Sequence, residues 1–168
     1  MDVSERASQI MSQKAPEFWD GLDFMESGDY GKALVCFLRC SKRGDVDAMQ
    51  FCGEIYAGGL GVAKNIPAAV EFWQMAADAD DVKSMFNLGK LCFFGDGVDQ
   101  DFADARTWFA RGATHGDAGS IFYLGVIVSQ GLGMERDIEA GRKLLMVASA
   151  DDSEYGRQAK AALDGLDK

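Results

Sequence analysis

The amino-acid sequence predicts an all-α fold, a right-handed α-solenoid of antiparallel helix pairs, from three observations. Gly53, Gly89 and Gly125 are spaced 36 residues apart, and a fixed period of about 20 to 50 residues is typical of repeat architectures. Between these glycines, apolar residues recur every three or four positions, which is helical spacing. Glycine is abundant and proline scarce, 20 residues against 2, which predicts many turns of one design.

Each repeat is predicted to begin with a helix, over about 46–57, 82–94 and 118–130. In the second of these segments, Met85, Leu88 and Cys92 lie on one helical face. A glycine-rich turn follows each helix, because glycine adopts the left-handed conformation that helix ends require. These turns contain two further sets of glycines 36 residues apart, Gly59, Gly95, Gly131 and Gly61, Gly97, Gly133.

A second helix is predicted after Asn65, Asp101 or Asp137, which are residue types that cap helix N-termini. Pro67 lies in the first turn of one such helix, where its missing N–H is tolerated. Small residues follow at fixed positions, such as Ala69 and its equivalents, and let the paired helices approach closely.

Two further segments complete the predicted domain over 1–168. Upstream, Phe18, Gly28, Ala33 and Phe37 indicate a shorter helix pair over about 14–44 that lacks the long glycine turn. Downstream, about 153–166 is predicted to form one amphipathic helix that caps the core of the last repeat, as terminal units of solenoids do. Its inward-facing residues are expected to be Tyr155, Ala159, Ala162 and Leu163.

The strings GEIYAGGLGVAKNIPAAVEFWQMAA at 53–77 and GKLCFFGDGVDQDFADARTWFARGA at 89–113 resemble the Sel-one-like repeat, SLR, a relative of the tetratricopeptide repeat. The third copy departs more, with Val128, Met134 and Leu144-Leu145 replacing a tyrosine, a valine and the aromatic pair. The resemblance implies three SLR units at about 45–80, 81–116 and 117–152, preceded by one tetratricopeptide-like unit at 14–44. The cysteine-rich bacterial branch pairs cysteines within each repeat, a pattern that this chain lacks.

The net charge of −10 and the sequence pI near 4.5 exclude two classes of partner. Nucleic-acid binding needs a basic surface to meet the phosphates, and an acidic surface is repelled by anionic membranes. The N-terminal residues have no basic region followed by an apolar run, and no apolar stretch is long enough to span a membrane. We therefore expect a cytoplasmic location.

Catalytic, metal-binding and cofactor-binding residues are not expected, and the chain is not expected to be an enzyme. The only histidine, His115, falls near the predicted end of a helix, where an imidazole suits the helix dipole. The glycine turns lack the spacing of phosphate-binding loops. An acidic cluster lacks the spacing of a calcium loop; its members are Asp96, Asp99, Asp101 and Asp104.

The cysteines show no metal-ligand spacing and are interpreted as small buried hydrophobic residues. A bridge between Cys40 and Cys52 remains an alternative that cytosolic conditions would not maintain. The four residues are Cys36, Cys40, Cys52 and Cys92.

The resemblance implies a partner-binding surface on the concave face formed by the first helices. Transferring the partner-facing positions of tetratricopeptide arrays gives Gln50, Glu54, Lys83, Phe86, Lys90, Phe93, Phe94, Phe122 and Val126. Two alternatives stay open for Phe86, Phe93 and Phe122. Either they form an exposed apolar patch flanked by Lys83 and Lys90, or they pack between adjacent repeats.

These observations predict a non-catalytic protein–protein interaction module, acting as an adaptor, assembly or regulatory protein that binds a protein or peptide. The alternative is an acidic cytoplasmic immunity or inhibitor protein that neutralises a basic toxin, because a charge of −10 would steer a basic partner toward it. An enzyme or an accessory of an envelope hydrolase is a less favoured interpretation. Self-association into a homodimer is a further option.

Overall fold

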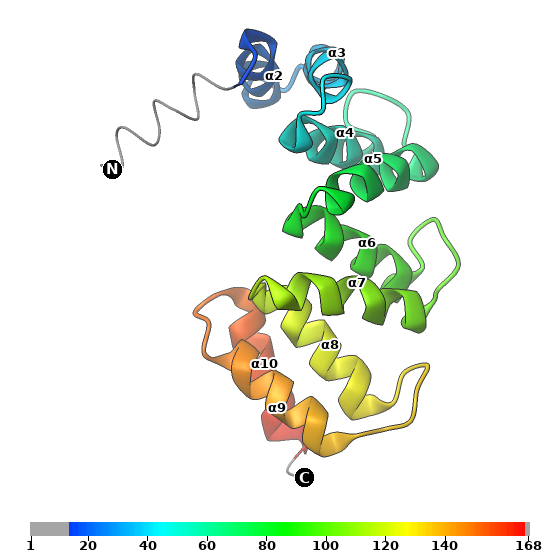
Figure 1. Ribbon diagram of the computed structural model, residues 1–168, viewed down its shortest axis with the longest axis vertical. Helices are drawn as coiled ribbons and strands as arrows, with labels where there is room; N and C mark the ends of the chain where they lie inside the picture. The colour runs from blue at the N-terminus through cyan, green and yellow to red at the C-terminus, as the bar shows by residue number, and fades with distance from the viewer. Residues whose placement is uncertain (1–13, 167–168) are drawn as a thin grey trace. The chain divides into compact units, whose positions relative to one another are not determined.

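The computed structural model describes residues 14–166, which form helices and no strands (Figure 1). The first helices predicted at 46–57, 82–94 and 118–130, and the capping helix predicted at 153–166, are confirmed to within a residue. The helices are α2 (Pro16–Glu26), α3 (Tyr30–Ser41), α4 (Val46–Gly58), α5 (Ile66–Asp78), α6 (Val82–Phe94), α7 (Phe102–Thr114), α8 (Ala118–Gln130), α9 (Ile138–Ser149) and α10 (Glu154–Leu166). The prediction that the chain has no secretory signal concerns residues 1–13, which lie outside the described range.

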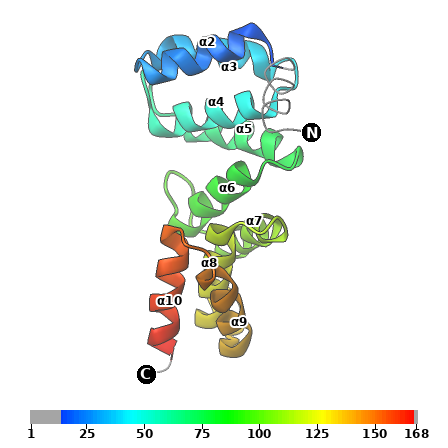
Figure 2. The same ribbon diagram turned by 90° about the vertical axis from the view of Figure 1, so that its left-hand side faces the viewer.

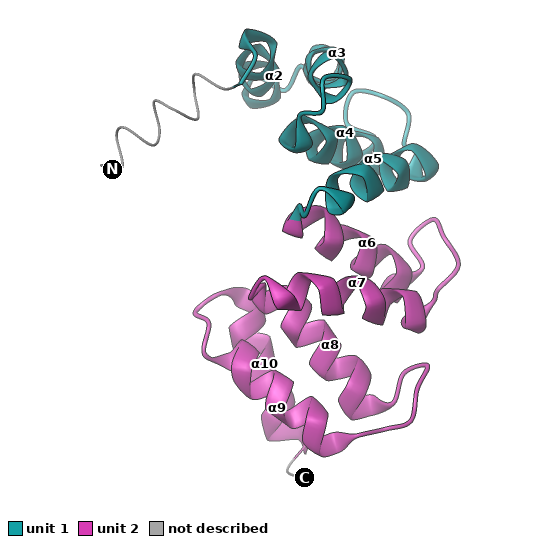
Figure 3. Ribbon diagram, in the orientation of Figure 1, with its two compact units in different colours: residues 1–81 teal, residues 82–168 magenta. Residues whose placement is uncertain are grey.

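The chain divides into two compact units, Met1–Asp81 and Val82–Lys168 (Figure 3). In the first unit, α2 packs on α3, α3 on α4 and α4 on α5. In the second unit, α6 packs on α7, α7 on α8 and α8 on α9, and α10 packs against α8 and α9 (Figure 2). The single domain predicted over 1–168 stays a prediction.

The second helix of every pair begins at a side-chain N-cap. The capping residues are Asp29, Asn65, Asp101 and Asp137, at intervals of 36 residues, and each side chain accepts a backbone N–H from the first turn. The oxygen-to-nitrogen distances run from 2.8 to 3.3 Å. Such a cap satisfies a backbone donor that the helix itself leaves without a partner. The cap at Asp29 extends the 36-residue register into the N-terminal pair.

Each second helix contributes one large buried side chain at the same repeat position. Phe37, Trp73, Phe109 and Leu145 are all buried, again 36 residues apart. Each packs on a glycine of the preceding helix, namely Gly21, Gly53, Gly89 and Gly125. A Cβ atom added at Gly89 would lie only 2.6 Å from Cε1 of Phe109, so the ring needs the space that glycine leaves. The paired glycine and large residue are 20 positions apart in the SLR units and 16 in the first pair, whose connection is shorter.

The glycine-rich connections are turns, as predicted. Gly59 and Gly131 end α4 and α8 in the left-handed conformation, with φ of +62° and +73°. Gly95 follows α6 with a φ of +68°. Side chains rarely adopt this conformation, which explains why glycine recurs there.

The cysteines are free thiols in this structure, and the alternative bridge between Cys40 and Cys52 is not formed. Cys40 and Cys52 lie in the hydrophobic core of the first unit. Burial raises the pKa of the Cys52 thiol to about 12, so it stays protonated and unreactive at neutral pH. Their interpretation as small buried hydrophobic residues is confirmed, whereas Cys36 and Cys92 are only half-buried.

Candidate protein-binding site

Aromatic rings gather along α6, α8 and α10 of the second unit. We call this set the aromatic strip: Phe86, Phe93, Phe94, Phe122, Tyr123 and Tyr155. Tyr123 lies at its centre, with its ring centroid 5.1 Å from that of Phe93 and 5.9 Å from those of Phe94 and Tyr155. It also stacks on the buried ring of Phe109, with centroids 4.9 Å apart. The strip is therefore anchored on the core of the second unit.

A glycine in α8 lets the strip run across three helices. Phe86 of α6 and Tyr155 of α10 meet edge to face, with ring centroids 5.3 Å apart. Both rings lie against Gly119, where an added Cβ atom would approach Phe86 Cε2 to 2.7 Å and Tyr155 Cδ2 to 3.1 Å. Any side chain at position 119 would therefore push these rings apart.

The question left open for the three phenylalanines is answered by their packing. Phe122 is only 9% exposed, and Phe86 and Phe93 are half-buried. Phe86 and Phe93 both contact the ring of Phe109 in the core. These three residues therefore pack between repeats. Phe94, by contrast, exposes 55% of its surface.

The other predicted binding residues lie in different surroundings. Gln50 is 3% exposed, and its backbone carbonyl accepts a hydrogen bond from the indole N–H of Trp73 at 3.3 Å. Gln50 and Glu54 belong to α4 in the first unit, whereas the remaining candidates lie on α6 and α8 in the second. Lys83 is exposed, and Lys90 and Val126 are half-buried. Partner binding by these residues stays a prediction.

Sequence reasoning missed Tyr123 and Tyr155 as members of this surface. Tyr155 lies 36 residues after Gly119. Extending the repeat register into the capping helix would have placed it beside that glycine. Tyr123 lies one position after Phe122, on a face that the transferred positions did not include.

The strip contrasts in charge with the acidic chain around it. Neither α6 nor α8 contains an aspartate or glutamate. Lys90 places its ammonium 5.5 Å from the centroid of the Phe86 ring, in a cation–π contact. Burial raises the pKa of the Tyr123 and Tyr155 phenols, and the nearby carboxylate of Glu154 raises both further. Both phenols are therefore neutral at physiological pH.

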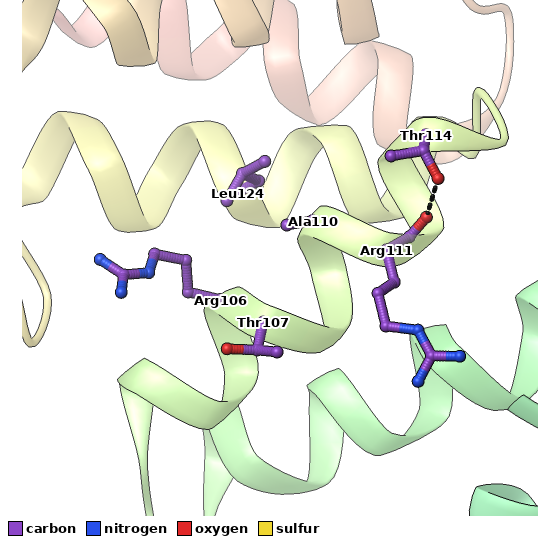
Figure 4. A pocket seen from close by; sticks show the side chains of 6 residues that line it. All are labelled: Arg106, Thr107, Ala110, Arg111, Thr114 and Leu124. Carbon is purple, nitrogen blue, oxygen red and sulfur yellow. Dashed lines mark hydrogen bonds between the residues drawn. The ribbon is translucent and has the colours of Figure 1, made fainter. Parts of the chain in front are cut away.

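A depression on α7 and α8, with a volume of about 530 Å³, is a weaker candidate (Figure 4). Its arginines do not converge: Arg106 donates to the sulfur of Met134 at 3.4 Å, and Arg111 lies over the Trp108 ring at 4.9 Å. Figure 4 shows the two side chains extending in different directions. Ligand sites need polar groups that converge, so we assign this depression no ligand.

Neither a metal-binding cluster nor a membrane-spanning helix is found within residues 14–166. No group of three or more histidine, cysteine, aspartate or glutamate side chains in that range could hold a metal ion. No helix in the same range is long and apolar enough to cross a membrane.

The model of the Sel1 repeat family matches residues 46–81, 82–117 and 118–149, more than half of the chain. The chain belongs to the Sel1 repeat family. The matched repeats begin one residue after the units predicted from the sequence. The first two end one residue after the predicted boundary, and the third ends three residues before it.

Solved structures of Sel1 repeat proteins have the same fold. One is c5321, a protective antigen present in uropathogenic Escherichia coli strains, with 28% identity over 80% of this chain and a TM-score of 0.76. Another is a Sel1 repeat protein from Oxalobacter formigenes, with 22% identity over 88% of this chain and a TM-score of 0.76. The predicted fold class, an all-α solenoid of helical repeats, is confirmed. This chain spans only 30% and 60% of those two chains, respectively. The search of curated proteins found no match.

Proposed function

We propose that this Sel1 repeat chain is a protein–protein interaction module that holds a partner segment against the aromatic strip of its second unit. The observation that carries this proposal is Phe94. Its ring is 55% exposed and contacts Phe93 and Tyr123, with centroids 4.9 and 5.9 Å away. Exposed aromatic residues beside half-buried ones are typical of the energetic centre of protein interfaces.

The strip is also ordered before any partner arrives. Phe93 packs on Phe109 and Phe102, with ring centroids 6.3 and 5.4 Å away. Rings held in this way lose little conformational entropy on binding, so more of the contact energy contributes to affinity. A strip anchored in the core therefore suits binding better than isolated surface phenylalanines would.

The experiment compares Phe94→Asp with Met146→Asp. Met146, on α9 of the same unit, is 58% exposed and lies outside the strip, so the two changes are matched in exposure and in added charge. The tagged full-length variants are used for affinity purification with quantitative mass spectrometry. We expect proteins retained by the wild type to be retained by Met146→Asp and lost, by about tenfold or more, from Phe94→Asp.

Equal retention by both variants would contradict the proposal. Circular dichroism and thermal melting accompany the comparison, because only variants that fold like the wild type are informative. Phe86 and Phe93 are poor choices for this test. They pack on Phe109, so charged substitutions there would also destabilise the core.

The finer roles predicted from the sequence remain proposals of the same kind: an adaptor, assembly or regulatory protein, located in the cytoplasm. The alternative, an acidic immunity or inhibitor protein for a basic toxin, rests on the net charge of −10. It predicts binding that weakens steeply as salt increases, because long-range attraction is screened. Homodimer formation would appear as a concentration-dependent mass in light scattering.

A further inference from the structure

The same two repeat positions carry opposite charges on the first helices of two successive repeats in the sequence. On α4 they are Asp47 and Glu54, and 36 residues later on α6 they are Lys83 and Lys90. Lys83 and Lys90 share one face of α6 with Phe86, because residues three, four and seven apart lie on the same side of a helix. Asp47 and Glu54 occupy the equivalent face of α4. The chain is strongly acidic elsewhere, so cations at these positions of α6 are a local departure from its composition.

The lysines of α6 are not neutralised by carboxylates of the described chain. Asp47 on α4 forms an ion pair with Lys14 at 2.7 Å. Within residues 14–166, by contrast, no carboxylate lies within 4.0 Å of the ammonium of Lys83 or Lys90. Lys90 instead lies over the ring of Phe86. Both cations are therefore available to a charged group from outside.

Carboxylates also lie near the strip, where α8 and α10 begin. They are Asp117 and Glu154, and both lie close enough to Tyr155 to affect its phenol. Burial raises the pKa of Tyr155, and the two carboxylates raise it further. The strip therefore has two cations along α6 and carboxylates where α8 and α10 begin. Lys83 and Lys90 are seven residues apart, about 10 Å along the helix.

We propose that the partner segment is acidic and apolar. Two of its carboxylates, about 10 Å apart, meet Lys83 and Lys90, while its apolar side chains cover Phe94 and Tyr123. This inference rests on the proposed function, because it names the chemistry of the segment that the aromatic strip holds. It also differs from the basic partner suggested by the net charge, since α6 itself carries two lysines and no carboxylate.

The test begins with a random dodecapeptide library displayed on phage and selected on the full-length chain. Peptides that also bind Phe94→Asp are removed in a parallel counter-selection. We expect the remaining peptides to be enriched in aspartate and glutamate beside leucine, phenylalanine or tryptophan. Strip-dependent peptides that are basic or neutral would overturn the inference and leave the proposed function standing. Failure to recover any strip-dependent peptide would count against the proposed function as well.

The second step measures the affinity of one enriched synthetic peptide by fluorescence polarisation. The variant Lys83→Glu/Lys90→Glu is compared with Lys143→Glu/Lys160→Glu, which changes the net charge equally at exposed positions of α9 and α10. Because α4 naturally carries Asp47 and Glu54 at the same repeat positions, acids there are compatible with the helix. We expect affinity to fall about tenfold more in the first variant. An equal fall in both variants would show only an effect of net charge and would overturn the inference.

Discussion

The two units repeat one arrangement of aromatic rings in different surroundings. In the first unit, Phe37 stacks on Phe51 with ring centroids 4.8 Å apart. Two repeats later, Phe109 stacks on Tyr123 with centroids 4.9 Å apart. Each residue of the second pair lies 72 positions after its equivalent in the first. In each unit the pair links a second helix to the first helix of the following repeat, whereas the equivalent position on α6 is Asn87.

The surroundings of these pairs differ because the strip positions differ. The position occupied by buried Gln50 on α4 is occupied by Phe86 on α6 and Phe122 on α8. Tyr123 is consequently surrounded by rings, including those of Phe93 and Phe94. Phe94, the most exposed residue of the strip, likewise has no aromatic equivalent, since Gly58 on α4 and Gln130 on α8 occupy its repeat position.

The largest expected effects test the equivalence of the two stacked pairs. Phe37→Ala and Phe109→Ala each remove a fully buried ring, so each should lower the free energy of unfolding by about 3–5 kcal/mol. Val35→Ala, at a position on α3 that is 50% exposed, should change it by less than about 0.5 kcal/mol. Urea unfolding monitored by circular dichroism measures all three. If one phenylalanine cost far more than the other, the two positions would not be equivalent.

This equivalence was largely predictable from the sequence. The 36-residue period located the helix starts at Asn65, Asp101 and Asp137, because a cap is a local device that its own residue encodes. The same register extends back to Asp29 and Phe37, but the glycine of the first pair, Gly21, does not follow it. The shorter connection between α2 and α3 shifts that glycine by four positions, which hid the full match of the N-terminal pair.

The exposure of the strip residues was not predictable from the sequence. Phe93 and Phe94 are adjacent on one helix, yet Phe93 packs on Phe109 while Phe94 is 55% exposed. That difference depends on which rings of α7 and α8 reach α6, a property of packing between repeats rather than of local sequence. Tyr155 joins the strip for the same reason, because Gly119 leaves room for it.

An intermediate effect on stability is expected at Gly119 of α8, where the rings of Phe86 and Tyr155 meet in the second unit. Gly119→Ala should destabilise the fold by about 1–3 kcal/mol, because the added methyl group overlaps Phe86 and Tyr155. It should also weaken partner binding by displacing the strip. Gly165→Ala, on α10, is the control, because a Cβ atom added there meets no atom within 4 Å. The only expected effect is the higher helix propensity of alanine relative to glycine, which stabilises by less than about 1 kcal/mol.

Thermal melting and binding to an enriched peptide measure both consequences of the Gly119 change. If Gly119→Ala melted at the wild-type temperature and bound normally, the rings would be free to rearrange. The rigid strip that distinguishes the second unit from the first would then be disproved. Unchanged stability in both Gly119→Ala and Gly165→Ala would also show that the rings rearrange freely.

The smallest expected effect concerns the helix N-caps. They recur in both units, but an ion pair accompanies the cap at Asp29 and not the one at Asp137. Asp29 on α3 is followed three residues later by Lys32, whose ammonium lies 2.6 Å away, whereas Asp137 on α9 is followed by Ala140. The hydrogen bond from the Lys32 side chain, with a further one from its backbone N–H, lowers the pKa of Asp29. Since the native state then binds fewer protons than the unfolded state, this stabilisation is present above the ordinary value near 3.8 and is lost as pH falls through the lowered pKa.

Asp29→Asn isolates this charge, because Asn65 caps α5 at the equivalent position through the same kind of hydrogen bond. We expect the variant to melt slightly below the wild type at pH 7. The difference in Tm should shrink as pH falls below about 4 and disappear once the pH is below the lowered pKa of Asp29. Lys32→Met should show the same convergence, since it removes the partner of the same ion pair. A difference in Tm that persisted undiminished to pH 3 would mean that the cap hydrogen bond, and not the ion pair with Lys32, accounts for the effect. The four caps would then be equivalent in both units.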